Sequence, residues 1–403
     1  MRRPGQVLRL AACATHPIQY QAPVWRVLAA DPGIELHVFF GTDMSLRGYH
    51  DPEFGAHVAW DSPLTAGYAH TFLSGGAQLQ KVGKWSPGAD GLRQRLREFK
   101  PDVALLTAYG SRFQMGALLA AKRVGARVIM RHEASDVAVS RTRFKGWLRD
   151  RFLKWLYARV DGFAVIGIEA GRHLERLGVA RPRMVPAPYC VDSDFFAGEA
   201  ARWCPNRKAI RAELGIGEGQ VALVFSGKLI PKKDPLLIVE ALRCVAPEFR
   251  NRLHLLVAGD GELRRELEEA AGEAFAGRFR FFGFLNQSEI GRVYAAGDLL
   301  ILPSRRGAGE TWGLVVNEAM QFGLGIVASD GVGCWPDLVN RGTGRVFPAG
   351  DPAAAGAAIR ECVEAIDRDP RGFSTTSRER VARFNPFSAA AGIAGIAGST
   401  LRS

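Results

Sequence analysis

The chain has 403 residues, of which 47% are hydrophobic and 23% charged, a composition typical of folded globular protein and a length that favours two domains. No segment approaches the ~20 consecutive apolar residues that a membrane-spanning helix needs, so we expect no integral membrane anchor. The net charge is +12, and residues 1–200 hold 27 basic against 18 acidic side chains. This imbalance predicts an acidic partner for the first half of the chain.

The N-terminus resembles a short secretion signal only superficially. Met1-Arg2-Arg3 precedes the apolar run Val7–Ala14, but Arg9 interrupts that run, and a first β-strand is the better interpretation. The six cysteines show neither paired nor zinc-like spacing, and a chain of this size does not need disulfides. We therefore expect the reducing environment of the cytoplasm.

Over the first 190 residues, short apolar runs alternate with segments of helical periodicity, as in a parallel, doubly wound sheet. Residues 41–84 are rich in glycine and proline, and we expect a mobile, irregular loop there. The predicted strands are Val7–Ala14, Ile34–Phe40, Val103–Thr107, Val128–Met130 and Gly162–Ile166, and the predicted helices are Ala22–Ala30, Gly91–Phe99, Phe113–Val124 and Glu169–Leu177.

One segment of the first half, residues 141–159, is both basic and aromatic. Its large apolar side chains recur at helical spacing among seven basic residues and one acidic residue. Such a helix can pack its apolar stripe on the sheet, which we slightly favour, or lie on an anionic membrane surface. The basic residues elsewhere are dispersed and accompany no nucleic-acid motif, so we expect no nucleic-acid partner.

Prolines and polar residues between 182 and 206 mark a break, after which a second alternating series begins. We expect an N-terminal domain at 1–190, a linker at 191–215, a C-terminal domain at 216–385, and a final helix at 386–403 that packs back on the N-terminal domain. The strands predicted in the second series are Val221–Ser226, Leu253–Ala258, Phe279–Phe282, Leu299–Leu302, Gly325–Ala328 and Arg345–Phe347.

The most informative motif is the stretch 309–320, in which Glu310 and Glu318 bracket an apolar run just after the predicted strand Leu299–Leu302. If a helix begins at Trp312, its free N–H groups lie beside Glu310 and suit an anion. Glu318, about two turns further on, returns to a similar face. Two such glutamates can also form an ordinary solvated face, but their position at the carboxyl end of a parallel strand favours a ligand site.

A glycine and two lysines follow the strand Val221–Ser226. Gly227 lets the backbone approach a phosphate, and Lys228 and Lys233 add mobile positive charges. A surface turn with solvated lysines is the commoner meaning of such a run. Together with the two glutamates, however, it favours a site for a sugar nucleotide.

These motifs, in this order, resemble the donor half of the family 4 glycosyltransferases over about residues 220–350. The resemblance rests on Gly227-Lys228-Leu229 with Lys233, Val257-Ala258-Gly259-Asp260-Gly261, Phe282-Gly283-Phe284, Leu302-Pro303-Ser304, the pair Glu310 and Glu318, and Gly333 with Pro336-Asp337-Leu338-Val339.

The resemblance implies an α/β chain of GT-B architecture, with two Rossmann-like, doubly wound domains facing a cleft. It also implies a nucleotide-sugar donor, retention of anomeric configuration and no metal ion or other cofactor. Lys228 and Lys233 correspond to residues that hold the diphosphate, Glu310 to a residue near the donor sugar, and Glu318 to the ribose ligand. The further donor-binding candidates are Gly227, Gly283, Phe284, Trp312, Gly313 and Leu314.

The first half resembles the family more loosely. Val128–Glu133 matches the strand whose trailing histidine reaches the donor sugar, so His132 joins Glu310 as a catalytic candidate. After the first strand, Thr15-His16-Pro17-Ile18-Gln19-Tyr20 stands where many relatives have a glycine-rich loop, and it resembles a subset of polysaccharide-assembly enzymes. His16, Gln19 and Tyr20 are therefore acceptor-side candidates.

We expect a cytoplasmic retaining glycosyltransferase that can associate with the inner face of the membrane. It would move a hexose or hexosamine from a nucleotide-sugar to a glycan or lipid-linked acceptor in polysaccharide or lipopolysaccharide assembly. No Asp-x-Asp pair or His/Cys cluster indicates a metal site. The alternatives are a GT-B epimerase or hydrolase acting on the nucleotide-sugar alone, and a non-catalytic scaffold that binds a sugar nucleotide.

Overall fold

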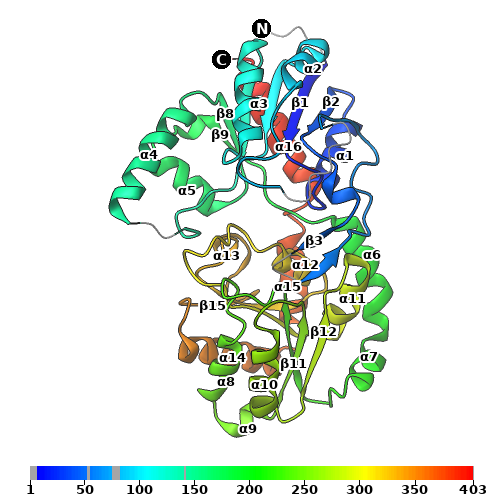
Figure 1. Ribbon diagram of the computed structural model, residues 1–403. Coiled ribbons are helices and arrows are strands. Elements are labelled where there is room, and N and C mark those ends of the chain that lie inside the picture. Colours follow the sequence, from blue (N-terminus) through cyan, green and yellow to red (C-terminus); the bar gives the residue numbers. More distant parts are fainter. Residues whose placement is uncertain (1–6, 52–54, 75–81, 140–141, 403) are drawn as a thin grey trace.

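The computed structural model describes residues 7–51, 55–74, 82–139 and 142–402. These residues form two domains that lie one above the other, each a twisted sheet with helices on both faces (Figure 1). The strands expected from the sequence are all present, and their bounds match expectation or differ from it by at most two residues. The predicted α/β fold class is confirmed.

The N-terminal domain is built on a sheet of seven parallel strands in the order β5-β2-β1-β6-β7-β8-β9, counted over the described residues. Its strands are β1 (Leu8–Ala14), β2 (Ile34–Phe40), β5 (Ala69–Phe72), β6 (Val103–Leu106), β7 (Arg127–His132), β8 (Gly162–Val165) and β9 (Met184–Pro186). Its helices are α1 (Ala22–Ala30), α2 (Leu92–Phe99), α3 (Arg112–Arg123), α4 (Arg143–Tyr157) and α5 (Ile168–Arg176).

The C-terminal domain has a parallel sheet of six strands in the order β12-β11-β10-β13-β14-β15 within the described part of the chain. Its strands are β10 (Val221–Ser226), β11 (Leu253–Ala258), β12 (Phe279–Gly283), β13 (Leu299–Leu302), β14 (Gly325–Ser329) and β15 (Gly344–Phe347). The main helices around it are α8 (Leu237–Arg243), α10 (Arg264–Phe275), α11 (Gln287–Ala296), α12 (Leu314–Gln321), α13 (Trp335–Leu338), α14 (Pro352–Arg368) and α15 (Gly372–Val381).

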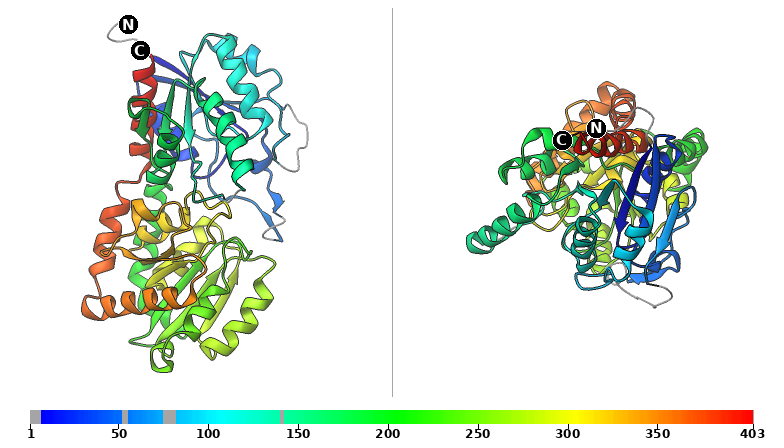
Figure 2. Two further views of the ribbon diagram at one scale, coloured as in Figure 1. Left: turned by 90° about the vertical axis from the view of Figure 1, so that its left-hand side faces the viewer. Right: turned by 90° about the horizontal axis from the view of Figure 1, so that it is seen from above.

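The last helix, α16 (Pro386–Thr400), lies against the N-terminal domain, where it packs on α1 and on β8 and β9 (Figure 2). Gly162 permits this contact, because a Cβ there would lie 2.6 Å from the Ile396 side chain. The chain thus crosses between the domains twice, once after β9 and once before α16.

Two segments are more regular than the sequence suggests. Within residues 41–84, β5 pairs with β2 at the edge of the large sheet, and β3 (Tyr49–Asp51) pairs with β4 (Ala56–Val58) as an antiparallel hairpin. These strands are too short and too polar to produce a clear hydrophobic period. Residues 52–54 and 75–81 of the expected loop lie outside the described residues.

The segment 191–215, expected to be a linker, folds into α6 (Ser193–Trp203) and α7 (Arg207–Glu213), which pack against α11 of the C-terminal domain. The Asp192 carboxylate caps α6 by accepting a hydrogen bond from the Phe195 N–H at 3.3 Å, and Phe196 is fully buried. One of the polar residues that mark the break in the sequence, Asp192, is therefore a helix cap.

Candidate functional site

Three adjoining cavities lie along the cleft between the domains, and each is named here by a feature of its lining. The glycine-loop cavity, of about 420 Å³, is lined by Gly227 and Gly259. The histidine cavity, of about 440 Å³, is lined by His132, and the hairpin cavity, of about 260 Å³, by Asp51 of the β3–β4 hairpin. Tyr20 lines all three, so the cavities meet at this side chain.

The wall of the glycine-loop cavity includes bare backbone at the carboxyl ends of β10 and β11. A Cβ at Gly259 would lie 1.8 Å from the carbonyl oxygen of Gly227, so only glycine allows the two loops to touch. The Gly259 N–H in turn donates to the Gly283 carbonyl at 2.7 Å, which ties the loop after β12 to the other two. A ligand can therefore approach the backbone closely here.

Two lysines flank this backbone, and each already contacts a carboxylate. Lys228 Nζ lies 2.9 and 3.1 Å from the two carboxylate oxygens of Asp51, which belongs to the N-terminal domain. Lys233 Nζ donates to the Glu310 carboxylate, which also accepts from the Ser304 hydroxyl at 3.3 Å. The positive charges expected from the sequence do line the cavity, with carboxylates as their partners.

Glu310 is 8% exposed and lies between the cavities, because its contact Lys233 lines the glycine-loop cavity and the next residue, Thr311, lines the histidine cavity. Burial raises the pKa of Glu310, but the adjacent Lys233 ammonium, with help from Lys232 and the Ser304 hydroxyl, more than offsets this and leaves the pKa below its ordinary value. Glu310 is therefore a carboxylate at neutral pH.

The helix of the two-glutamate motif begins later than the sequence predicts. Gly313 has a φ of 102°, and α12 starts at Leu314, so Trp312 precedes the helix. Glu318 lies in the second turn and lines the glycine-loop cavity together with Leu314. Its carboxylate accepts from the Tyr294 hydroxyl at 2.8 Å, and burial raises the pKa of Glu318 to about 7.

Trp312 and Gly313 line none of the three cavities. The Trp312 side chain is 2% exposed, and its Nε1–H donates to Asn317 Oδ1 at 2.8 Å. A Cβ at Gly167, in the N-terminal domain, would lie 2.3 Å from the indole ring. Trp312 thus packs across the domain interface, and it positions the loop that bears Glu310 instead of lining the cavity.

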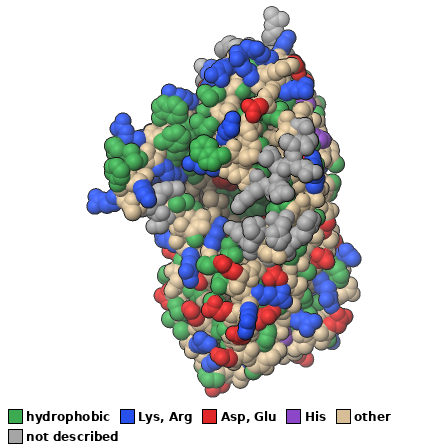
Figure 3. All heavy atoms as spheres, viewed as in Figure 1, with side chains coloured by type: hydrophobic (Ala, Val, Ile, Leu, Met, Phe, Trp, Pro, Cys, Tyr) green, Lys and Arg blue, Asp and Glu red, His purple; other side chains and the backbone are tan. Residues whose placement is uncertain are grey.

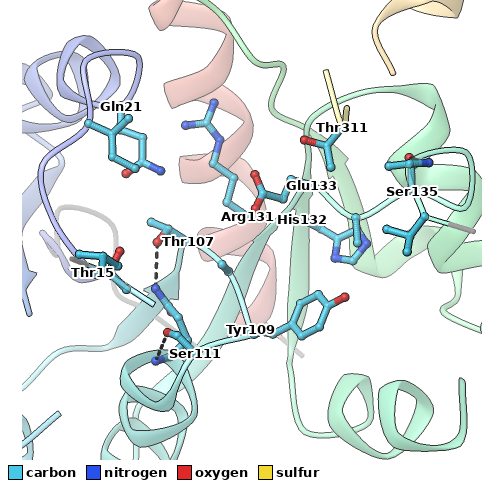
Figure 4. Close-up of a pocket in the computed structure, with 18 of the residues that line it drawn as sticks. Thr15, Gln21, Thr107, Tyr109, Ser111, Arg131, His132, Glu133, Ser135 and Thr311 are labelled. Atoms are coloured by element: carbon cyan, nitrogen blue, oxygen red, sulfur yellow. Dashed lines mark hydrogen bonds between the residues drawn. The ribbon is translucent and has the colours of Figure 1, made fainter. Parts of the chain in front are cut away.

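Polar side chains line the histidine cavity, as Figure 4 shows. Four of its lining side chains are 1–3% exposed and have atoms with no hydrogen-bond partner among the described residues. Because an unpaired buried polar atom costs free energy, such a cluster is typical of a site completed by a ligand or by water. The atoms are Oε1 of Gln21, Oε1 of Gln114, Nε and Nη1 of Arg131, and both ring nitrogens of His132.

His132, the last residue of β7, is one of these groups. Its ring lies parallel to that of His173 with centroids 5.4 Å apart, and His173 Nδ1 contacts Asp136 Oδ1 at 2.8 Å. Burial, followed by the neighbouring His173, lowers the pKa of His132 to about 3. A neutral imidazole follows, which can exchange hydrogen bonds with a hydroxyl but adds no charge.

Backbone contacts hold the loops that follow His132 and precede Glu310 side by side. The N–H groups of Gly307 and Gly309 donate to the carbonyls of Val137 and Ala138 at 2.9 and 2.5 Å. The structure therefore pairs the loops that adjoin the two catalytic candidates, although the candidates are 178 positions apart in the sequence.

Two of the three acceptor-side candidates lie where cavities meet, and the third lines one cavity. Gln19 lines the glycine-loop and hairpin cavities, and Tyr20 lines all three. His16 lines the hairpin cavity, its Nδ1 lies 2.9 Å from the Thr15 hydroxyl, and burial lowers its pKa to about 4. Phe284 lines the glycine-loop cavity, whereas Gly283 supports it through its backbone.

Sequence reasoning missed several lining residues. Arg131 stands directly before His132, and a charged residue at the end of a buried strand was a usable signal. Gln114 is one polar residue among many on a helix, and nothing in the sequence distinguishes it. Asp51 and Trp60 lie in a segment without periodicity, so no sequence pattern places them opposite the C-terminal domain.

No group of three or more His, Cys, Asp or Glu residues that could hold a metal ion occurs in the part of the chain that the structure describes. The absence of a metal from the reaction stays a prediction.

Comparison with known proteins places both halves of the chain in one family. Residues 206–377 match the family described as glycosyl transferases group 1, and residues 9–190 match the glycosyl transferase 4-like domain. The D-inositol 3-phosphate glycosyltransferase of Geodermatophilus obscurus is 35% identical over 202 residues, which cover 48% of this chain and 43% of that protein. The sulfoquinovosyl transferase SQD2 of Arabidopsis thaliana is 27% identical over 290 residues, 68% of this chain and 52% of that protein. The chain thus spans about half the length of these relatives.

Solved structures with the same architecture extend over nearly the whole chain. A glycosyltransferase from Rickettsia africae ESF-5 superposes with a TM-score of 0.71 at 14% identity and covers 98% of this chain and 99% of its own. Anabaena HepE in complex with UDP gives a TM-score of 0.70 at 15% identity and covers 98% of this chain and 100% of its own. At these identities the likeness establishes the GT-B fold alone. With both domains matched in sequence and the fold matched throughout, the chain belongs to the family 4 glycosyltransferases.

Proposed function

We propose that the protein transfers a sugar residue from a nucleotide-sugar bound in the glycine-loop cavity to a hydroxyl group of an acceptor in the histidine cavity. The observation on which this rests is the adjacency of two unlike sites. One holds two lysines and Glu318 around bare backbone, and the other holds buried polar atoms that lack partners. Glu310 and Tyr20 lie where the two meet.

In this proposal the donor nucleotide lies along the glycine loops. Lys228 and Lys233 hold the diphosphate beside the backbone of Gly227, and Glu318 accepts hydrogen bonds from the ribose hydroxyls. The base lies against Phe284, which lines the same cavity. The roles of these residues follow from the family resemblance, and the fact that they line or adjoin one cavity supports this assignment of roles.

The sugar then lies at the junction of the cavities, where His132 and Glu310 orient its hydroxyls. The bond between the anomeric carbon and the diphosphate breaks, the acceptor oxygen bonds to that carbon on the same face, and the acceptor proton passes to the leaving phosphate oxygen. Lys228 and Lys233 stabilise the negative charge that develops on the diphosphate. Retention of configuration and independence of metal ions are parts of this proposal.

The acceptor is a glycan or a lipid-linked acceptor, and the transferred sugar a hexose or hexosamine, in polysaccharide or lipopolysaccharide assembly. The unpartnered amide oxygens of Gln21 and Gln114 and the nitrogens of His132 support a hydroxyl-rich ligand, since hydroxyl groups both donate and accept hydrogen bonds.

We also propose that α4 contacts an anionic membrane surface. Five of its large apolar side chains are 45–69% exposed, contrary to the packed helix favoured from the sequence, and they face outward beside basic residues (Figure 3). The one acidic residue of the helix, Asp150, turns inward to Arg176. Within α4, all of whose residues the structure describes, the buried residues are Leu153, Leu156 and Tyr157. The exposed residues are Phe144, Trp147, Leu148, Phe152 and Trp155.

No helix within the described residues is both long and apolar enough to cross a bilayer. Surface attachment through α4 would combine aromatic insertion with attraction of lysine and arginine side chains to anionic lipids. The test is sedimentation with vesicles of mixed anionic and zwitterionic lipid. Replacing Trp147 and Trp155 by Ser should release the protein, whereas replacing Trp85, which is 74% exposed on another part of the domain, should not. Equal release by both changes would reject a specific role for α4.

The transfer proposal is tested first by thermal shift with UDP, GDP, ADP, CMP and their sugar conjugates, because a ligand that binds only the folded state raises the melting temperature. Reaction of the stabilising conjugate with candidate acceptors, followed by product analysis, should then give a glycoside with the donor's anomeric configuration. Hydrolysis or epimerisation of the conjugate without transfer would favour the alternative enzyme classes. Nucleotide binding without turnover would favour a scaffold.

A further inference from the structure

Three residues of the N-terminal domain, Asp51, Trp60 and Asp61, contact the C-terminal domain through their side chains. Asp51 binds Lys228 after β10. The ring of Trp60 meets that of Phe284 edge to face, with centroids 6.4 Å apart. The Asp61 carboxylate accepts from the N–H and the hydroxyl of Ser288, at 3.1 and 2.5 Å. These contacts hold the three side chains against the C-terminal domain, and Trp60 lines the glycine-loop cavity.

Asp51 is well placed to influence ligand binding. Its side chain is 11% exposed and that of Lys228 25%, so water screens the pair only partly. Lys228 lines both the hairpin cavity and the glycine-loop cavity, and Asp51 approaches it from the hairpin side. An anion that reaches Lys228 from the glycine-loop side must therefore come close to a carboxylate that already neutralises the ammonium group.

We propose that Asp51 is a resident anion, which holds Lys228 while the site is empty and yields it to the diphosphate of the donor. Asp51 thereby determines how strongly the site selects ligands by phosphate charge. This inference rests on the proposed function, because it requires a phosphate group at Lys228. Lys233 has a similar carboxylate partner in Glu310, but that pair lies within one domain, whereas the Asp51 contact joins the two domains.

If a ligand phosphate replaces Asp51 at Lys228, the effect of an Asp51 substitution on affinity should depend on whether the ligand carries phosphate. Removing the charge of Asp51 ends its competition with phosphate, so a nucleoside diphosphate should bind Asp51→Asn more tightly than the unaltered protein. We expect a gain of about two- to fivefold, the range for an ion pair that water partly screens. The corresponding nucleoside, which has no phosphate to compete, should bind both proteins equally.

The experiment is calorimetric titration of the full chain with the nucleoside diphosphate that gives the largest thermal shift, and with its nucleoside. Asp51→Ser is a second neutral replacement in case Asp51→Asn folds poorly, and melting curves without ligand show whether each variant is folded. Asp43→Asn is the matched control, since Asp43 pairs with Arg47 within the N-terminal domain. It should leave both affinities unchanged.

A double-mutant cycle with Lys228→Ala isolates the contact. In that background Asp51→Asn should give no gain, because no ammonium group remains to be released. Weaker diphosphate binding by Asp51→Asn, an equal gain for the nucleoside, or a gain that persists without Lys228 would each overturn the inference.

Two further outcomes separate this inference from the proposed function. If nucleotides bind the unaltered protein and Asp51→Asn equally well, the resident-anion role fails and the donor site stands. If no nucleotide binds any variant, the donor site fails and the inference fails with it.

Discussion

The glycine-loop cavity and the histidine cavity hold their polar groups in opposite states. Around the first, Lys228, Lys233 and Glu318 each contact a carboxylate or a hydroxyl group of the protein. Around the second, Gln21 and His132 have polar atoms with no partner among the described residues. One cavity is lined by satisfied charges, and the other by unsatisfied groups that are largely neutral.

Each cavity therefore suits a different kind of ligand. A satisfied charge must exchange one partner for another, so only a ligand with a strong charge of its own gains from binding there. An unsatisfied buried group has already lost its water, so a ligand hydroxyl that reaches it restores a hydrogen bond with little opposing cost. The first arrangement suits a diphosphate, and the second suits a sugar or polyol.

The largest expected effect is at the charged side. Lys228→Ala should weaken nucleoside diphosphate binding by about ten- to a hundredfold, because it removes a charge-assisted contact and leaves the negative charge of Asp51 close to the phosphates. Calorimetry measures the affinity, and Lys208→Ala, which removes an exposed lysine of α7, is the control. Unchanged affinity in Lys228→Ala would remove this lysine from the site and break the contrast between the two cavities.

His132→Ala should act on turnover and not on nucleotide affinity. The neutral imidazole lies outside the glycine-loop cavity, so nucleoside diphosphate binding should stay the same, while kcat should fall by on the order of ten- to a hundredfold if the ring orients the transferred sugar. His132→Asn, which keeps a donor and an acceptor, should recover part of the rate. A parallel loss of nucleotide affinity would mean that the two cavities do not work separately.

Gln21→Leu should separate stability from function. The amide oxygen of Gln21 is buried without a partner, so a leucine of similar size should raise the melting temperature slightly. The same change should raise the KM for the acceptor by about three- to tenfold if that oxygen accepts a ligand hydroxyl. A stability gain with an unchanged KM would indicate that water alone completes this group.

The smallest expected effect is a change in the pH dependence of stability. Burial raises the pKa of Glu318 from its ordinary 4.5 to about 7, so between these values the folded protein binds a proton that the unfolded chain has released. The contribution of Glu318 to stability is therefore present in acid, declines as the pH rises towards 7, and is constant above it. Glu318→Gln lacks this titration. The melting temperature of Glu318→Gln should therefore rise relative to that of the unaltered protein between about pH 5 and pH 8. A difference in melting temperature that does not change with pH would contradict the raised pKa.

The sequence predicts the sheets well because parallel strands buried on both faces are nearly continuous apolar runs, as in Val221–Ser226 and Leu253–Ala258. It also predicts that Lys228, Lys233 and Glu318 line one cavity, because each charged residue can be recognised from its position after a buried strand. The β3–β4 hairpin could not be predicted, since its position depends on contacts with the other domain.

Two further differences have local physical causes. Trp312 was expected in the ligand site because its neighbours are, but the left-handed conformation of Gly313 delays the helix, and the indole packs across the interface against Gly167. The aromatic residues of α4 follow a helical period, which shows that they share a face. The period cannot show whether that face is covered, and in the structure it is open.

The chain joins its domains through two separate connections, one after β9 and the other before α16. A domain that is connected to its neighbour at two points can rotate about the line through these points, but it resists twisting and sliding relative to that neighbour. Opening of the cleft would therefore change its width, but it would not shift the residues of one domain along the other. Each time the halves came together, Asp51 would return to face Lys228, and the loop after His132 would meet the loop before Glu310 in the same alignment.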